Sequence, residues 1–144
     1  MSETTREKFI REAREKLERD KLEWQKLKES LIDQEMLDDD GYPTEIDLEL
    51  IEKWHWTDTT GWLEFIKGIW WAADWGWNEG EEPHEWDEGK KCYRYHVSTG
   101  GWSGNESIIH SMQKADFMWN LNWVQSRRGG HYIFELKEFD DKST

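Results

Sequence analysis

Two glycine-rich stretches in the last third of the sequence carry residue types suited to holding an anion. The candidate ligand-binding residues are Thr99, Gly100, Gly101, Trp102, Ser103, Gly104, Asn105, Arg127, Arg128 and His131. Glycine lets the backbone approach a bound group closely, arginine supplies positive charge, and an indole ring offers a stacking face. The combination suits a small molecule that bears a phosphate or a carboxylate. The alternative is that these turns and arginines serve the fold alone.

Histidine and carboxylate side chains could add acid–base chemistry. His96, His131 and Glu135 are expected on one polar sheet face, where a general acid–base pair is a weaker alternative. No two histidines have the i, i+4 spacing of a zinc-binding helix, and a single cysteine, Cys92, excludes an internal disulfide and a cysteine-rich zinc site. No phosphate-binding-loop, dinucleotide-binding or serine-hydrolase motif occurs. We therefore expect no metal, no cofactor and, on balance, no catalysis.

Three strands and a helix must position these residues. Residues 91–98 alternate between two faces, as a half-buried strand does, and residues 116–126 alternate again. Between them Ser103 and Glu106 fit a capping box that starts a helix. Residues 127–130 predict a hairpin turn into a strand at 131–138. Because a helical crossover joins strands of the same direction, we expect strands 91–98 and 116–126 to be parallel and both turns to leave one end of the sheet.

Helices dominate the earlier part of the chain. Residues 5–36 predict one long amphipathic helix that begins at a Thr4–Glu7 capping box. Thr44 caps a second helix that runs through Trp54, and a third helix runs from Asp58 to Ala73. Residues 74–89 lack a clear period and are predicted to form a loop pinned by tryptophans. The expected fold is α+β: a long N-terminal helix and two short helices, then a β-α-β-β unit with a small mixed sheet.

Charge is concentrated in one segment. The chain of 144 residues has a net charge of −13 and twelve tryptophans, and residues 37–90 hold sixteen acidic but only three basic side chains. The negative charge of this segment disfavours binding to duplex nucleic acid and would attract a basic surface of a partner protein. The alternative is that it only keeps an aromatic-rich domain soluble. No stretch approaches the roughly 18 apolar residues of a membrane span. We expect a soluble cytoplasmic protein without a membrane partner.

The segments 1–36, 37–90 and 91–144 are expected to form one globular domain. Asp20 interrupts the apolar stripe of the long helix, and two facing aspartates would be costly to bury in a parallel dimer. We therefore predict that the helix packs mainly on the protein body. A homo-oligomer, if formed, would pair this helix antiparallel or use another surface.

The runs YRYHVSTGGWSGNESIIHSMQ and FMWNLNWVQSRRGGHYIFEL extend this interpretation. Through the motifs STGGWSGNE and SRRGGHYIFE, residues 91–138 resemble a family of small uncharacterised proteins encoded by bacteriophages and prophages. The resemblance implies a phage accessory protein that acts in the host cytoplasm, and it lends no activity.

The leading functional hypothesis is a binding protein. It would hold an anionic, nucleotide-like ligand between residues 99–105 and 127–131 and thereby counter a host function. One alternative is an acidic interaction protein that blocks a basic, nucleic-acid-binding surface of a host protein. Another is a hydrolase that uses His96, His131 and Glu135.

Overall fold

The computed structural model describes residues 2–32, 41–84 and 86–137. The chain divides into two compact units, Met1–Gln34 and Glu35–Thr144, and each is described by itself. The predicted end of the first helix at residue 36 and the predicted last residue of the final strand, 138, lie outside the described residues.

The first unit contains α1 (Thr5–Ile32), which confirms the long helix. The Glu7 amide donates to the Thr4 hydroxyl at 3.1 Å, as the predicted cap requires. Along the exposed surface of the helix, Arg11 pairs with Glu3 at 2.9 Å and with Glu15 at 3.2 Å. Such exposed pairs stabilise a helix only slightly, so its length reflects good helix formers and the absence of glycine and proline.

The second unit begins with three helices: α2 (Glu45–Lys53), α3 (Thr59–Ile69) and the short α4 (Ala73–Gly76). Thr44 caps α2, as predicted, and Asp58, the predicted first residue of the third helix, is the N-cap of α3. The third helix ends four residues before the predicted Ala73. The Trp70 backbone is extended, and its indole N–H donates to the Ser98 carbonyl at 3.2 Å, which ties the chain to the sheet instead of continuing the helix.

The sheet has four strands in the order β1-β2-β4-β3: β1 (Trp77–Pro83), β2 (Lys91–Ser98), β3 (Trp123–Arg127) and β4 (His131–Glu135). The predicted bounds of β2 are confirmed. All neighbouring strands are antiparallel, so the sheet is not mixed. β2 and β3 do run in the same direction, but β4 lies between them. The α+β class is confirmed, with this correction to the pairing.

Two segments differ from their predicted structure. Residues 77–83 form the edge strand β1, not part of a loop. Residues 116–122, predicted as strand, form α6 (Asp116–Asn122), and only residues 123–127 are extended. In α6 the buried Met118 and Asn122 are four residues apart, and the Asn122 amide donates to the Met118 carbonyl at 2.8 Å. Burial at helical spacing outweighs the alternation of the aromatic residues.

The first helix after β2 is α5 (Ser103–Lys114), and α6 follows it before β3. Its predicted Ser103–Glu106 capping box is wrong, because the N-cap is Trp102 and makes no side-chain capping bond. The Ser103 hydroxyl donates to the Tyr42 hydroxyl at 3.2 Å instead. The predicted apolar side of this helix is confirmed, since Ile108, Ile109 and Met112 are buried.

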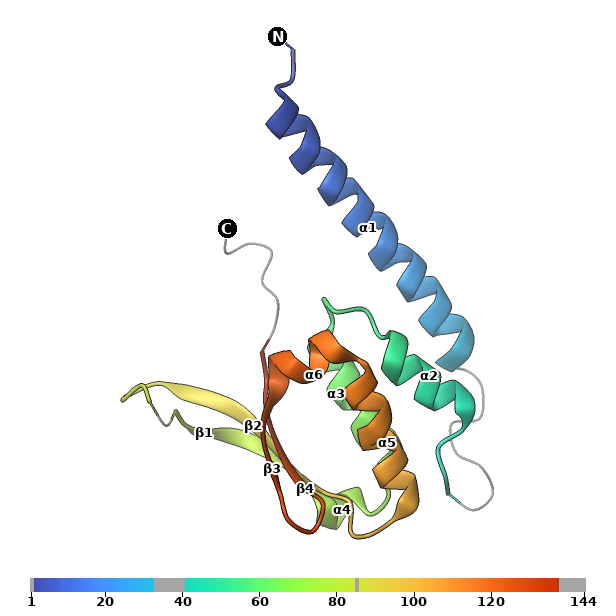
Figure 1. Cartoon of the computed structure of the whole chain (residues 1–144), viewed down its shortest axis with the longest axis vertical. Coiled ribbons are helices and arrows are strands. Elements are labelled where there is room, and N and C mark those ends of the chain that lie inside the picture. The colour runs from blue at the N-terminus through green and yellow to red at the C-terminus, as the bar shows by residue number, and fades with distance from the viewer. Residues whose placement is uncertain (1, 33–40, 85, 138–144) are drawn as a thin grey trace. The chain divides into compact units, whose positions relative to one another are not determined.

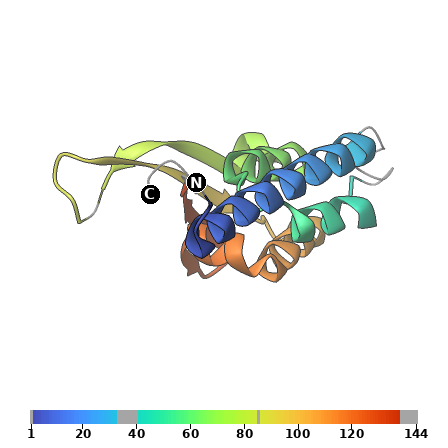
Figure 2. The same ribbon diagram turned by 90° about the horizontal axis from the view of Figure 1, so that it is seen from above.

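One face of the sheet carries the core. Figures 1 and 2 both show α3, α5 and α6 on the same side of the sheet, while the outer part of the β1–β2 hairpin extends away from them. The most deeply buried large side chains of this layer include Trp62, Leu63, Ile66, Val97, Ile108, Met112 and Phe134. The opposite face is therefore the one on which polar side chains can gather.

Candidate functional site on the polar sheet face

The two glycine-rich turns meet at one end of the sheet, as predicted. Ser98, the last residue of β2, pairs with His131, the first residue of β4. Just beyond, the Thr99 amide donates to the Gly130 carbonyl at 3.0 Å. Gly130 has a φ of 76°, and a Cβ there would lie 2.2 Å from the Thr99 hydroxyl oxygen. Only glycine permits this close approach of the two turns.

The side chains of Trp102 and Asn105, at the end of the first turn, contact other residues of the protein. Asn105 is 1% exposed. Its carbonyl oxygen accepts the Trp71 amide at 2.9 Å, and its amide donates to the carbonyls of Trp71 at 3.1 Å and of Thr99 at 3.4 Å. The Trp102 ring stacks with Tyr42 and Trp71, at centroid distances of 4.7 and 5.0 Å. Asn105 and Trp102 thus hold the turn in place, which differs from the ligand contacts expected of them.

Other aromatic rings are exposed beside the same turn. Trp71 is 46% and Trp75 64% exposed. A Cβ on Gly100 would lie 3.2 Å from the Trp75 ring and 3.6 Å from the Trp71 ring, so both indoles pack close to this glycine. The sequence does not identify these rings as a pair, because Trp71 falls in the predicted third helix and Trp75 in the segment 74–89 that is predicted as a loop.

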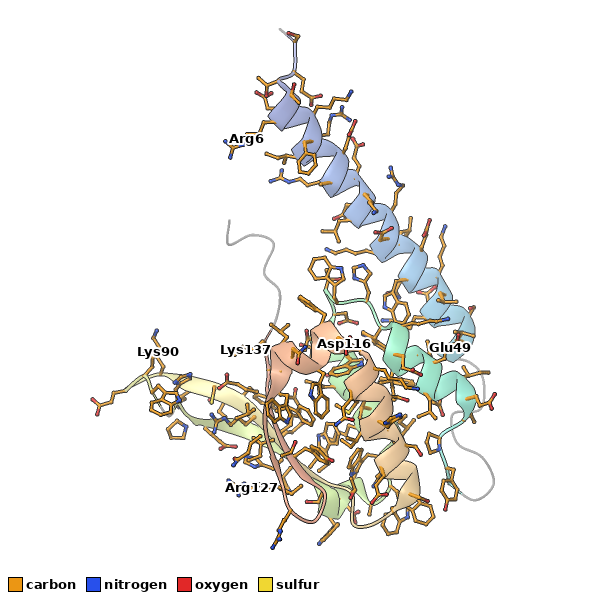
Figure 3. The ribbon with its side chains drawn as sticks, in the orientation of Figure 1. Arg6, Glu49, Lys90, Asp116, Arg127 and Lys137 are labelled. Atoms are coloured by element: carbon orange, nitrogen blue, oxygen red, sulfur yellow. The ribbon has the colours of Figure 1, made fainter. Side chains whose placement is uncertain are left out.

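The second turn and the adjoining strands form a polar row. Register places Ser98, His131 and Arg127 side by side across β2, β4 and β3. Paired residues of antiparallel strands project from the same face, and Figure 3 shows Arg127 on the side away from α5 and α6. Arg127 and Arg128 are exposed. Glycines at 129 and 130, both with positive φ, complete the turn.

Within this row, a hydroxyl and an imidazole are hydrogen-bonded. Ser98 Oγ lies 2.8 Å from His131 Nδ1. Burial lowers the pKa of His131, and the charges of His96 and Arg127 lower it further. His131 is therefore neutral at pH 7, and its ring can accept the Ser98 proton.

A second imidazole lies one row further along the sheet. His96 pairs with Ile133 in the register, and its ring centroid is 6.0 Å from that of His131. His96 Nε2 lies 2.6 Å from a Glu82 carboxylate oxygen, and both side chains are about one-third exposed. Glu82 belongs to β1, and the sequence could have identified it only by recognising β1 as a strand.

Glu135 shares this face with the two histidines, as predicted, but its carboxylate pairs with basic side chains and not with either imidazole. Its carboxylate lies 2.8 Å from Lys137 and 3.7 Å from Arg94. Burial alone would raise the pKa of Glu135, but hydrogen bonds from Lys137 and Cys92 outweigh it, and the pKa is lowered. Figure 3 shows Lys137 on the same side of the sheet as Arg127. Glu82, not Glu135, is the carboxylate bonded to a histidine of this sheet face.

Two surface hollows lie at other places in the second unit. One of about 350 Å³ is lined by Trp54, Trp56 and Phe117 among others, and one of about 470 Å³ lies between α2 and α5. Of the candidate ligand-binding residues, the larger hollow includes only Ser103. Among the described residues, no group of three or more His, Cys, Asp or Glu side chains could hold a metal ion.

No helix within the described ranges is long and apolar enough to cross a membrane. Comparison of the chain with protein-family models, with curated proteins and with solved structures gave no match. Functional inference therefore depends on the geometry of the polar row and the two turns.

Proposed function

We propose that the chain is a binding protein for a small, phosphate-bearing ligand at the end of the sheet where residues 99–101 meet residues 127–131. The observation that carries the proposal is the Thr99–Gly130 hydrogen bond of 3.0 Å. This bond fixes the two turns against each other at the point where Ser98, Arg127 and His131 form one row.

The residues of this row have complementary roles toward an anion. Arg127 supplies a permanent positive charge with several donors, and its Nε–H donates to Gln125 of its own strand at 3.3 Å. Arg128 adds a second exposed charge in the turn. Charge-assisted hydrogen bonds of this kind are stronger than neutral ones. A phosphate is therefore the best-matched group.

The exposed rings of Trp71 and Trp75 favour a ligand that has a planar part as well as a phosphate. Both rings pack close to Gly100, at the same end of the sheet. Indole faces stack on nucleobases, and each stacked base contributes about 1–3 kcal/mol. A nucleotide-like ligand would use this surface in place of the Trp102 ring.

Titration calorimetry of the full chain against mono-, di- and cyclic nucleotides and inorganic phosphate tests the proposal. We expect heat of binding from at least one nucleotide, and weaker binding in Arg127→Ala and Arg128→Ala. Arg6→Ala is the matched control, because Arg6 is an exposed arginine of α1. Trp75→Ala should weaken nucleotide binding more than phosphate binding. The absence of heat from every ligand, or binding indifferent to both arginines of the turn, would contradict the proposal.

A second candidate function is that of an acidic interaction protein. The observation that favours it is the extended β1–β2 hairpin, which carries Glu79, Glu81 and Glu82 and has Trp86, 86% exposed, in its connecting segment. Such a surface would bind a basic host protein through contacts that salt screens. Capture of host partners at low salt but not at high salt would support this function. Capture that is insensitive to salt would contradict it.

For the biological setting, we propose a phage accessory protein that acts in the bacterial cytoplasm and counters a host function. The motifs of residues 91–138 support this proposal by their resemblance to phage proteins. The genomic position of the gene tests it. A position within a phage or prophage supports the proposal, and a position among conserved host genes contradicts it.

A further inference from the structure

Anion binding alone does not account for the hydroxyl–imidazole pair of the polar row. Arginine charge is enough to hold a phosphate, whereas Ser98 and His131 add a potential nucleophile and a base 2.8 Å apart. This distance is within the range expected for a nucleophile hydrogen-bonded to its activating base. His131 pairs with Ser98 on one side and with Arg127 on the other, so a phosphate held by the arginine would lie on the same sheet face as the hydroxyl.

The protonation state of His131 fits the role of a base. With its ring proton on Nε2, His131 can accept the Ser98 proton at Nδ1. Burial and neighbouring charge lower its pKa, which keeps the ring neutral at pH 7.

Glu82 and His96 complete the arrangement. The His96 ring lies between the Glu82 carboxylate, 2.6 Å away, and the His131 ring, with a centroid distance of 6.0 Å. The contact with the Glu82 carboxylate therefore holds the His96 ring beside the base.

From this geometry we propose that the site hydrolyses phosphate esters, with Ser98 as nucleophile, His131 as general base and acid, and Glu82–His96 as a positioning pair. The inference rests on the proposed anion site, because Arg127 must hold the phosphoryl group. The substrate class is an organic phosphate ester, such as a nucleotide.

The reaction is balanced in two steps. Ser98 Oγ attacks phosphorus and gives its proton to His131 Nδ1. The bond from phosphorus to the leaving oxygen breaks, and the leaving alkoxide takes the proton from His131. A water molecule then attacks the phosphoserine and gives a proton to His131. The bond from phosphorus to Ser98 Oγ breaks, and the oxygen takes that proton back. The products are an alcohol and phosphate from a monoester, or an alcohol and a phosphate monoester from a diester, and Arg127 stabilises the charge on the transferred oxygens.

Release of para-nitrophenol from para-nitrophenyl phosphate and bis(para-nitrophenyl) phosphate by the full chain tests the proposal. We expect turnover above the buffer rate with at least one of the two esters. Ser98→Ala and His131→Asn should each reduce it by about 100-fold or more. Glu82→Gln should lower kcat by roughly tenfold and leave KM unchanged. His110→Ala, an exposed histidine of α5, is the matched control and should leave turnover unchanged.

The outcomes separate this inference from the proposed binding function. Nucleotide binding by calorimetry without turnover of either ester would overturn the hydrolytic inference and leave the binding function supported. Turnover that survives Ser98→Ala in a protein with a native circular dichroism spectrum would overturn the role of Ser98. Absence of both binding and turnover would overturn both proposals. A phosphate group found on Ser98 after an acid quench would support the covalent step.

Discussion

The two glycine-rich turns at the end of the sheet have similar compositions but place their side chains differently. After the first turn, Asn105 is buried and bonded to backbone groups, and Trp102 is stacked with two other rings. In the second turn, Arg127 and Arg128 are exposed. The first turn therefore serves as a scaffold and the second presents charge to solvent. Composition alone does not separate these roles, because burial decides which polar atoms a ligand can reach.

The largest expected effect is loss of stability when the scaffold is cut. Asn105→Ala would remove the buried amide that bonds the Trp71 amide, the Trp71 carbonyl and the Thr99 carbonyl, and we expect a loss of about 3 kcal/mol in the free energy of unfolding. Urea denaturation measures this loss. Asn120→Ala, at an exposed position of α6, is the control and should change stability by less than about 0.5 kcal/mol. Equal effects of the two substitutions would refute the scaffold role.

A pair of glycine substitutions tests how closely the turns approach each other. Gly129 and Gly130 both have positive φ, but a Cβ on Gly129 would meet nothing within 4 Å, whereas one on Gly130 would meet Thr99. We expect Gly129→Ala to cost about 1 kcal/mol from backbone strain alone, and Gly130→Ala to cost about 2 kcal/mol or more. Thermal or urea denaturation would show the difference. If Gly130→Ala is no worse than Gly129→Ala, the two turns are not in contact.

Substitution in the second turn should weaken ligand binding and leave stability nearly unchanged. Arg127→Ala is expected to leave the free energy of unfolding within about 0.5 kcal/mol of the parent, since the side chain is exposed. Affinity for a phosphate-bearing ligand should fall by roughly tenfold to a hundredfold, as expected for a lost charge-assisted hydrogen bond. Denaturation and calorimetry on the same preparation measure both quantities. A loss of stability as large as that of Asn105→Ala would make Arg127 part of the scaffold.

The smallest expected effect is a dependence on pH. The pKa of His131 lies below its ordinary value of 6.5, so the ring gains a proton only as the pH falls below that value. Its added charge should tighten anion binding by roughly twofold to fivefold. Hydrolysis should fall over the same range, because a protonated ring cannot act as base. Calorimetry and turnover assays across this range, repeated with His131→Gln, measure both trends. Unchanged pH dependence of binding in the variant would exclude His131 from the site.

Much of the fold could be predicted where local pattern and tertiary burial agree. The bounds of β2 follow from the alternation of Tyr93, Tyr95 and Val97, and the start of α2 follows from the Thr44 cap. β1 could not be predicted, because Gly80 and its neighbouring glutamates are poor strand formers, and the strand depends on pairing with β2. The sequence predicts a strand in place of α6 because large apolar side chains recur at every second position from Phe117 to Trp123, while burial of Met118 and Asn122 favours a helix.

The sequence predicts the placement of the candidate site on the sheet, but not the long-range contacts of its side chains. The meeting of the turns and the shared face of His96 and His131 follow from the order of strands and helix, and the structure confirms both placements. The bond between Glu82 and His96 depends on the missed strand β1. The burial of Asn105 depends on Trp71, a residue 34 positions earlier in the chain. No local pattern could have shown either contact.

The central claim is that both turns contribute to one anion site, and amide chemical shifts test it most directly. The measurement is a titration of the isotope-labelled full chain with the nucleotide that binds best, followed by ¹H–¹⁵N correlation spectra. The account predicts that shifts of residues 99–101 and of residues 127–131 change together and fit a single dissociation constant, while α1 is unaffected. Shifts confined to one turn, or centred on the hollow between α2 and α5, would contradict it.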